Sequence, residues 1–169
     1  LNMSKILKSF LYIAICAFAF VIIMKAYSSS FASKTATVFE WEKEVSIYLS
    51  NSKMGSSDDC TLVFSVTRKI LNAETFGPGA LEALLKGPTL EDKENGYTTS
   101  INDNVLIQRF EILDNVAYVD FNSRFNEGMG GSCRVQAIRS QIETTLNNLP
   151  DIDSGVISVN GETEGILEP

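Results

Sequence analysis

The sequence predicts an α+β domain, a two-layer sandwich of one mostly antiparallel sheet and two helices, preceded by one N-terminal transmembrane helix. Three observations support this fold class. An uncharged apolar run lies between Lys8 and Lys25. Short segments rich in β-branched and aromatic residues follow, and turn residues separate them. Two further segments carry leucine or isoleucine at helical spacing. Together these segments give the element order β-β-α-β-β-α-β.

The apolar run covers Ser9 to Met24, and apolar neighbours extend it to residues 6–27. A helix of about twenty residues crosses a hydrocarbon core of about 30 Å. Two lysines precede the run and one follows it closely, which favours an N-terminus on the cytoplasmic side. We therefore expect residues 6–27 to cross the membrane once and the following domain to lie outside the cytoplasm.

Two alternatives stay open for residues 1–27, and each places the domain across the membrane. The segment can be a cleaved signal peptide, because Ser30-Phe31-Ala32 is a tolerable small-x-small cleavage site. It can also be a lipoprotein signal with Cys16 as the lipidated residue, although the apolar run continues past this cysteine. We expect residues 28–40 to be a flexible linker and residues 41–169 to be the folded domain.

The charge and the absence of histidine exclude several classes of function. After Lys25 the chain holds 21 acidic and 11 basic residues, a formal charge of −10. Such a domain repels nucleic acid, and no basic stripe offers a path for phosphates. The chain has no histidine, which excludes Ser–His and Cys–His nucleophilic pairs and histidine-ligated metal sites. Carboxylate chemistry stays possible, and we expect no cofactor or metal.

The domain begins with two predicted strands and a helix. Val45–Leu49 alternates apolar and mixed residues, and Leu62–Ile70 is rich in β-branched and aromatic residues. A turn-rich loop joins them, which predicts a hairpin. The segment Ala80–Lys86 places three leucines on one helical face, and Gly87-Pro88 stops this helix. Thr89–Asn104 is expected to be a long polar loop.

A second predicted hairpin joins Val105–Leu113 to Val116–Phe121. The connection is Asp114-Asn115, and both residue types tolerate the left-handed conformations that a two-residue hairpin turn requires. The second of these strands places three apolar side chains on one face, while Asp120 falls on the other. The alternation predicts that one face of this hairpin is buried.

The second helix is expected to follow the glycines of segment 128–131, with Ser132 as its N-cap. Five apolar residues at steps of three or four form a narrow stripe for the core: Val135, Ile138, Ile142, Leu146 and Leu149. Gly155–Val159 is the last clear strand, and Asn160-Gly161 turns the chain after it. Ile166-Leu167 is expected to pair briefly at the sheet edge. Both helices are expected on one face of a single sheet.

Three phrases of the sequence resemble the pattern of a known domain family. ALEALLKGPT (Ala80–Thr89) resembles the family's helix followed by Gly-Pro-Thr. VAYVDFNSRF (Val116–Phe125) resembles its strand ending in an Asp-Phe pair. QIETTLNNLPDIDSGVISVNG (Gln141–Gly161) resembles its helix, short turn and terminal strand. The phrases occur in the order found in the GerMN domain, a family named for a spore-germination protein, and the resemblance covers Val45 to about Gly161.

The resemblance implies a module of the bacterial envelope, held at the cytoplasmic membrane by a signal anchor or a lipid. It attaches no catalytic residues, and it implies structural roles for Gly87, Pro88, Thr89, Asp120, Phe121 and Gly161. Some members belong to the envelope complex between mother cell and forespore, and the fold is similar to ring-building modules of secretion machines. This chain carries one copy of the domain where the germination protein has two, so a role in sporulation or germination is open.

Cys60 and Cys133 are the two cysteines of the domain. In an oxidising compartment, a disulfide between them would tie the first hairpin to the second helix. It would close a loop of about 74 residues, for which the chain-entropy argument gives roughly 4 kcal/mol. Two separate, partly buried thiols are the alternative. A catalytic Cys133, activated by the helix N-terminus, is a third interpretation that lacks a histidine base.

Two weaker motifs remain. The glycine-rich segment 128–132 precedes a helix, where backbone N–H groups can bind anions, but the lysine of Walker-type loops is missing. A flexible connector is therefore the better interpretation. Glu40, Glu42 and Glu44 offer the paired carboxylates of a glycoside hydrolase, but they precede the domain and lack a visible partner. Arg139 and Glu143 are expected to form a surface pair one helical turn apart.

The sequence therefore favours a non-enzymatic scaffold or interaction module that self-associates or docks to another envelope protein. A binding domain for a cell-wall or lipid component is the alternative, and a hydrolase is a third hypothesis. The face or edge of the sheet that the helices leave uncovered is the expected contact surface. The sequence identifies no small-molecule ligand.

Overall fold

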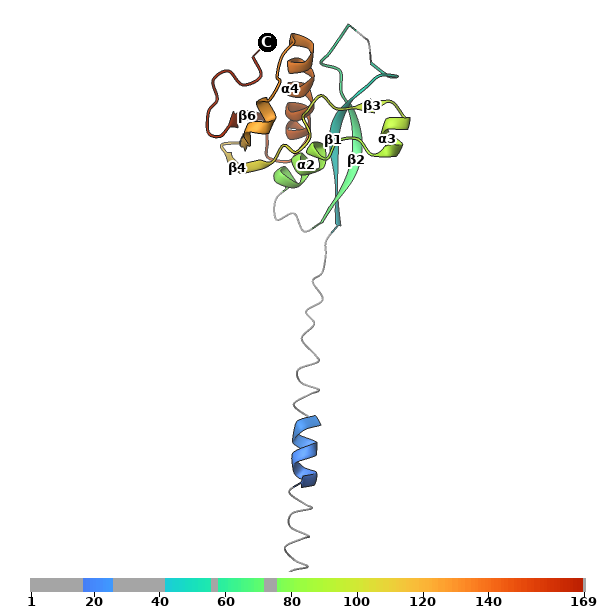
Figure 1. Cartoon of the computed structure of the whole chain (residues 1–169), viewed down its shortest axis with the longest axis vertical. Helices are drawn as coiled ribbons and strands as arrows, with labels where there is room; N and C mark the ends of the chain where they lie inside the picture. The colour runs from blue at the N-terminus through green and yellow to red at the C-terminus, as the bar shows by residue number, and fades with distance from the viewer. Residues whose placement is uncertain (1–16, 26–41, 56–57, 72–75, 169) are drawn as a thin grey trace, which may run out of the picture. The chain divides into compact units, whose positions relative to one another are not determined.

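The structure is a computed structural model that describes residues 17–25, 42–55, 58–71 and 76–168. Residue contacts divide the chain into two units, Leu1–Phe39 and Glu40–Pro169. In the first unit, residues 17–25 are helical and exposed (Figure 1). Within the described part of the chain, no helix has the length and apolar character needed to cross a membrane. Most of the predicted anchor, its cleavage site, Cys16 and the linker lie outside the described residues.

The second unit is an α+β domain, which confirms the α+β class of the prediction. Its elements follow one another in this order (Figure 1): β1 (Glu42–Asn51), β2 (Phe64–Leu71), α2 (Phe76–Leu85), α3 (Leu90–Glu94), β3 (Tyr97–Thr98), β4 (Ile107–Leu113), β5 (Val116–Phe121), the 3-10 helix η1 (Ser123–Asn126), α4 (Ser132–Asn147) and β6 (Ser154–Val159). The strands form two three-stranded sheets, ordered β2-β1-β3 and β4-β5-β6. The prediction of a single sheet is therefore wrong.

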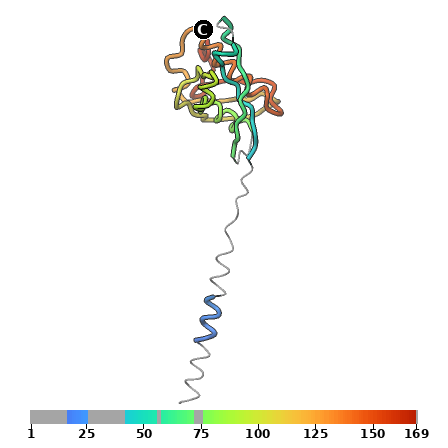
Figure 2. The backbone as a smooth tube through the Cα atoms, turned by 90° about the vertical axis from the view of Figure 1, so that its right-hand side faces the viewer, coloured from blue at the N-terminus to red at the C-terminus, as the bar shows by residue number. Residues whose placement is uncertain are grey.

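The break between the sheets lies at the edge of β1. This strand pairs antiparallel with β2 along its length (Figure 2) and with β3 only at Ser50 and Asn51. Beyond β3, the backbone N–H of Tyr48 donates to the hydroxyl of Thr145 on α4 at 3.0 Å. Because a helix side chain takes the hydrogen bond that another strand would take, the first sheet ends here.

The second sheet combines a hairpin with a parallel pair. β4 and β5 are antiparallel, and β5 and β6 are parallel because α4 makes the crossover between them. The predicted two-residue turn between β4 and β5 is confirmed, since Asp114 and Asn115 have φ angles of 51° and 62°. The predicted pairing of Ile166-Leu167 is wrong: Val159 forms a bridge with Glu162 instead.

The predicted loop Thr89–Asn104 is also wrong, because it contains α3 and β3. Thr89 and Asp92 form a capping box: the hydroxyl of Thr89 accepts from the N–H of Asp92, and the Asp92 carboxylate accepts from the N–H of Thr89. Two helix ends differ from prediction as well. α2 begins at Phe76, before Pro78, which fits the first turn where its missing N–H is harmless. The N-cap of α4 is Gly131 and not Ser132, with no side-chain cap.

One core joins both sheets through the two long helices. α4 packs on β1 and on β6, while α2 packs on α4, β1, β2 and β4. The helices therefore contact both sheets, instead of covering one face of a single sheet. The predicted stripe of α4 is buried from Val135 to Leu149. It meets Leu81 and Leu84 of α2 and the inner residues of β1 and β5 in one hydrophobic cluster.

Candidate functional site

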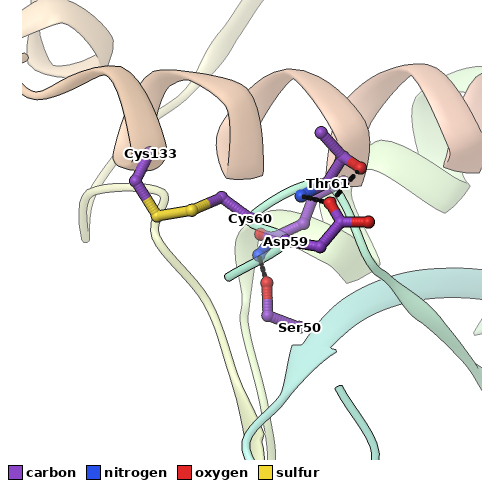
Figure 3. The surroundings of a disulfide bond; sticks show 6 residues. Ser50, Asp59, Cys60, Thr61 and Cys133 are labelled. Carbon is purple, nitrogen blue, oxygen red and sulfur yellow. Dashed lines mark hydrogen bonds between the residues drawn. A yellow bond between two sulfur atoms is a disulfide. The ribbon is translucent and has the colours of Figure 1, made fainter. Parts of the chain in front are cut away.

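Cys60 and Cys133 form a disulfide, with their Cα atoms 5.2 Å apart (Figure 3). Cys60 is half-buried in the loop between β1 and β2, and Cys133 is exposed in the first turn of α4. The predicted link between the first hairpin and the second helix is confirmed. In this oxidised state neither of the other two interpretations, separate thiols or a catalytic thiol, applies.

The disulfide lines an open groove of about 740 Å³. Polar side chains surround it, among them Ser50, Ser52, Thr98, Ser100, Ser132 and Arg134. Arg134 donates to the carbonyl oxygens of Ser100 and Gly128, and its other terminal nitrogen donates to the side chain of Asn102. All three acceptors are neutral oxygens, so the groove keeps a positive charge at this wall.

Asp59 supplies a negative charge on the loop side of the groove (Figure 3). The hydroxyl and the backbone N–H of Thr61 both donate to its carboxylate. These hydrogen bonds lower the pKa of Asp59, so this exposed group is ionised at neutral pH. The groove therefore presents both signs of charge to a ligand.

A buried polar network lies behind the groove and was missed by the sequence analysis. Gln141 is fully buried on α4. Its amide nitrogen donates to the hydroxyl of Ser50 at 3.0 Å, and its amide oxygen accepts from the hydroxyl of Thr99 at 2.9 Å. Gln141 follows Ile138 by three positions, as Thr145 follows Ile142, so both extend the apolar stripe. That spacing is the signal that could have found them.

The motif Gly87-Pro88-Thr89 lies where α2 ends and α3 begins. Gly87 has φ 70°, and its N–H donates to the carbonyl of Leu84 to close α2. Thr89 caps α3, and Arg68 on β2 donates to the Asp92 carboxylate. Burial raises the pKa of Asp92, but the hydrogen bonds from Thr89 and Arg68 outweigh it and lower the pKa. The motif borders a smaller hollow of about 330 Å³.

Asp120, Phe121 and Gly161 lie together in the second sheet, away from Gly87, Pro88 and Thr89. The buried carboxylate of Asp120 accepts from the hydroxyl of Ser158 and from the N–H of Gly161, both at 2.7 Å. The fully buried ring of Phe121 stacks on Phe125, with centroids 4.6 Å apart. These residues hold the end of the sheet.

The remaining candidates form ordinary surface contacts. Glu42 pairs with Lys69 at 3.0 Å, Glu44 is exposed on β1, and Glu40 lies outside the described residues. The predicted pair of Arg139 and Glu143 forms at 3.1 Å. In the glycine-rich segment, Gly128 and Gly131 have positive φ angles of 59° and 82°, which explains the glycines. The described ranges hold no group of three potential metal ligands.

The outer face of the second sheet carries exposed apolar side chains beside charged ones, and no helix of the described chain covers it. The strand register aligns Glu111, Tyr118 and Val156 across this face, with Leu113 and Val116 in the neighbouring row. The side chains of Leu113, Tyr118 and Val156 are 58%, 42% and 37% exposed. The opposite face, with Ala117, Val119 and Phe121, is buried in the core. We call the exposed side, from Leu113 through Tyr118 to Val156, the outer face.

Comparisons with known proteins show which family and which solved structures this domain is similar to. A family model described as "Germane: Sporulation and spore germination" matches residues 46–165. The first GerMN domain of the sporulation protein GerM from Bacillus subtilis is similar in fold, with 19% identity, a TM-score of 0.50, and coverage of 72% of this chain and 85% of that chain. The tandem GerMN domains of the same protein match at 23% identity and a TM-score of 0.56, over 80% of this chain.

The chain spans about half of that tandem structure, 48% of its length. Among curated proteins, none matches this chain. The structural likenesses establish the fold, and the family match covers most of the domain, including all three phrases of the predicted resemblance. The chain therefore belongs to the Germane family of sporulation and spore germination, whose characteristic unit is the GerMN domain.

Proposed function

We propose that this protein is a non-enzymatic interaction module of the bacterial cell envelope. Its N-terminal segment tethers it to the cytoplasmic membrane, its domain lies outside the cytoplasm, and it docks to an envelope protein or to itself during sporulation or germination. The observation that carries the proposal is the outer face, where Leu113, Tyr118 and Val156 expose apolar surface on a rigid sheet. Contiguous apolar patches on a folded domain mark contact surfaces for proteins.

The location outside the cytoplasm is supported by chemistry on both units. Cys60 and Cys133 form a disulfide, and such bonds persist in oxidising compartments and are rare in the cytosol. The apolar run with its flanking lysines supports an anchor with a cytoplasmic N-terminus. A compartment-sensitive reporter fused after Pro169 tests this part: activity in the cytosol would overturn it.

The contact surface is tested by photo-crosslinking in intact cells. A photoreactive phenylalanine analogue replaces Tyr118, and in a matched control it replaces Leu90, which is 80% exposed on α3. We expect protein adducts at position 118 and none at position 90. Equal adducts at both positions, or none at 118, would show that the outer face is not the contact surface.

The groove beside the disulfide supports a second candidate, a binding domain for a cell-wall or lipid component. Its volume of about 740 Å³ and its mixture of Arg134, Asp59 and hydroxyl groups suit a small polar ligand. Sedimentation with purified peptidoglycan or with liposomes tests it. Ser132→Trp fills the groove, while Tyr118→Lys alters only the outer face. Binding that Ser132→Trp abolishes and Tyr118→Lys preserves favours this candidate; the absence of sedimentation rejects it.

A further inference from the structure

We infer that the domain pairs with a second copy of the same chain through the free edge of β4, which borders the outer face, about a two-fold axis at Phe110. The inference rests on the proposed function and specifies its partner. Two copies would form one continuous six-stranded sheet, ordered β6-β5-β4-β4-β5-β6. Three properties of β4 support this pairing: its free hydrogen-bonding groups, its charges and its exposed apolar side chains.

The first property is a free edge. β4 is the outermost strand of its sheet and pairs with β5 on one side only. In a two-residue hairpin, the residues that flank the turn exchange both backbone hydrogen bonds, and here these are Leu113 and Val116. Counting back along β4, the N–H and C=O groups of Ile112 and Phe110 therefore point away from β5. No described residue forms a backbone hydrogen bond with them from that side. Free edges of this kind are templates for another strand.

The second property is a self-complementary pair of charges. Arg109 and Glu111 flank Phe110 and share the face that also carries Tyr118. If Phe110 of one copy faces Phe110 of the other, each Arg109 lies opposite Glu111 of the partner subunit. These positions are not hydrogen-bonded to the other copy, so their side chains approach most closely. The described residues give Glu111 no ion-pair partner within its own chain.

The charges also select this register over its neighbours. Because outward groups must face outward groups, the register can shift only by an even number of residues. Shifting the pairing by two residues in one direction places Glu111 opposite Glu111 of the partner subunit. Shifting it by two in the other direction places Arg109 opposite Arg109 of the partner subunit. Like charges directly opposite one another are destabilising, so the register centred on Phe110 is the one that the sequence favours.

The third property is exposed apolar surface along the same strand. Among the described residues of the domain, nine large apolar side chains are exposed, and three of them lie on β4 or in the residue before it: Leu106, Ile112 and Leu113. In the register centred on Phe110, the Ile112 and Leu113 end of each strand lies beside the Ile107 end of the other. Pairing therefore covers the apolar ends of both strands while the two ion pairs form between them.

The test is an exchange of charges between two variants of the full chain in mild detergent. Sedimentation velocity over a range of protein concentrations should show a monomer–dimer equilibrium for the wild type. Glu111→Arg alone and Arg109→Glu alone each place like charges opposite one another, and each should raise the dimer Kd about tenfold or more. An equimolar mixture of the two variants should dimerise again. In the mixed dimer, each residue at position 109 or 111 faces a residue of opposite charge on the partner subunit. Circular dichroism checks that both variants are folded.

A second measurement on the wild type avoids any effect of the substitutions on folding. Hydrogen exchange at the amides of Phe110 and Ile112 should slow as protein concentration rises, while the amide of Lys69 on β2 stays unchanged. A wild type that stays monomeric, single variants that dimerise like the wild type, or a mixture that stays monomeric would each overturn the inference. If the dimer fails while crosslinks persist at position 118, another protein is the partner and the proposed function stands. If those crosslinks also fail, the proposed function falls with it.

Discussion

The carboxylate of Asp120 holds two segments that lie about forty residues further along the chain, through hydrogen bonds from Ser158 and from the backbone of Gly161. Asp120 lies on β5, Ser158 on β6 and Gly161 in the turn that follows. One buried side chain therefore fixes both the parallel strand pair and the turn that ends it. The hydrogen bond from Ser158, then the one from Gly161, lower the pKa of Asp120, which means that folding stabilises its ionised form.

Asp120→Ala should lower the free energy of unfolding by about 1–3 kcal/mol, because it leaves the N–H of Gly161 without its acceptor and leaves the hydroxyl of Ser158 only the longer bond to the carbonyl of Val119. Asp120→Asn keeps one oxygen acceptor and should cost less. Denaturant unfolding at neutral pH measures both. If Asp120→Ala were as stable as the wild type, these bonds would contribute nothing to the end of the sheet.

The same residue predicts a dependence on pH. Its pKa is lower in the folded state than in the unfolded chain, so its contribution is fully present above the unfolded value near 4. The contribution is lost as the pH falls through the folded value. The difference in stability between wild type and Asp120→Asn should therefore shrink in acid. A difference that stays constant from neutral pH into this acidic range would contradict the assignment.

Replacing both Cys60 and Cys133 with serine should lower the free energy of unfolding by about 2–4 kcal/mol, because the unfolded chain regains the freedom of a long loop. Reduction of the wild type with a thiol reagent is the matched control and should give a similar loss. Thermal or denaturant unfolding measures both. Equal stability of the oxidised and reduced domains would show that the loop between β1 and β2 is held by other contacts.

Gln141→Leu should lower the free energy of unfolding by about 1–3 kcal/mol, because it leaves the half-buried hydroxyls of Ser50 and Thr99 without their shared partner. A double-mutant cycle with Ser50→Ala isolates the pair. The second substitution should cost less in the Gln141→Leu background than in the wild type. Additive losses would mean that the two side chains act independently.

Gly77→Ala should also be destabilising, by about 1–3 kcal/mol, because a Cβ atom at this position would lie 2.2 Å from the ring of Phe110. Gly130→Ala is the matched control, since a Cβ atom there meets nothing within 4 Å. Thermal unfolding of the two variants compares them directly. Equal melting temperatures would show that α2 can shift away from β4 to make room for the added methyl group without a loss of stability.

Sequence reasoning succeeded where the signal is local. The turn at Asp114-Asn115 and the stripe of α4 depend on residues within one or two turns of each other, and both were predicted. The disulfide followed because the domain has only two cysteines. For the outer face, the sequence predicted an uncovered side of the sheet but not its residues. Which residues are exposed depends on the face against which the helices pack.

The errors concern contacts between distant segments. β3 is two residues long and is a strand only because Tyr97 pairs with Asn51 on β1. The division into two sheets depends on Thr145, whose hydroxyl meets the backbone of β1. Neither pairing partner can be read from the local sequence, although the spacing of Thr145 on α4 does mark it as facing inward. The capping box at Thr89 and Asp92 did leave a local pattern, since Thr-x-x-Asp is a recognisable helix start.

The hydrogen bond between Tyr48 and Thr145 joins residues 97 positions apart, and Gln141 and Ser50 are separated by 91. β1 therefore cannot form all of its contacts until α4, the last helix of the domain, has been synthesised. A nascent chain with such long-range contacts completes its fold only after most of it has been synthesised. Until then, its early segments are accessible to proteases and chaperones. A truncation before α4 would thus yield no stable half, but a chain destined for degradation.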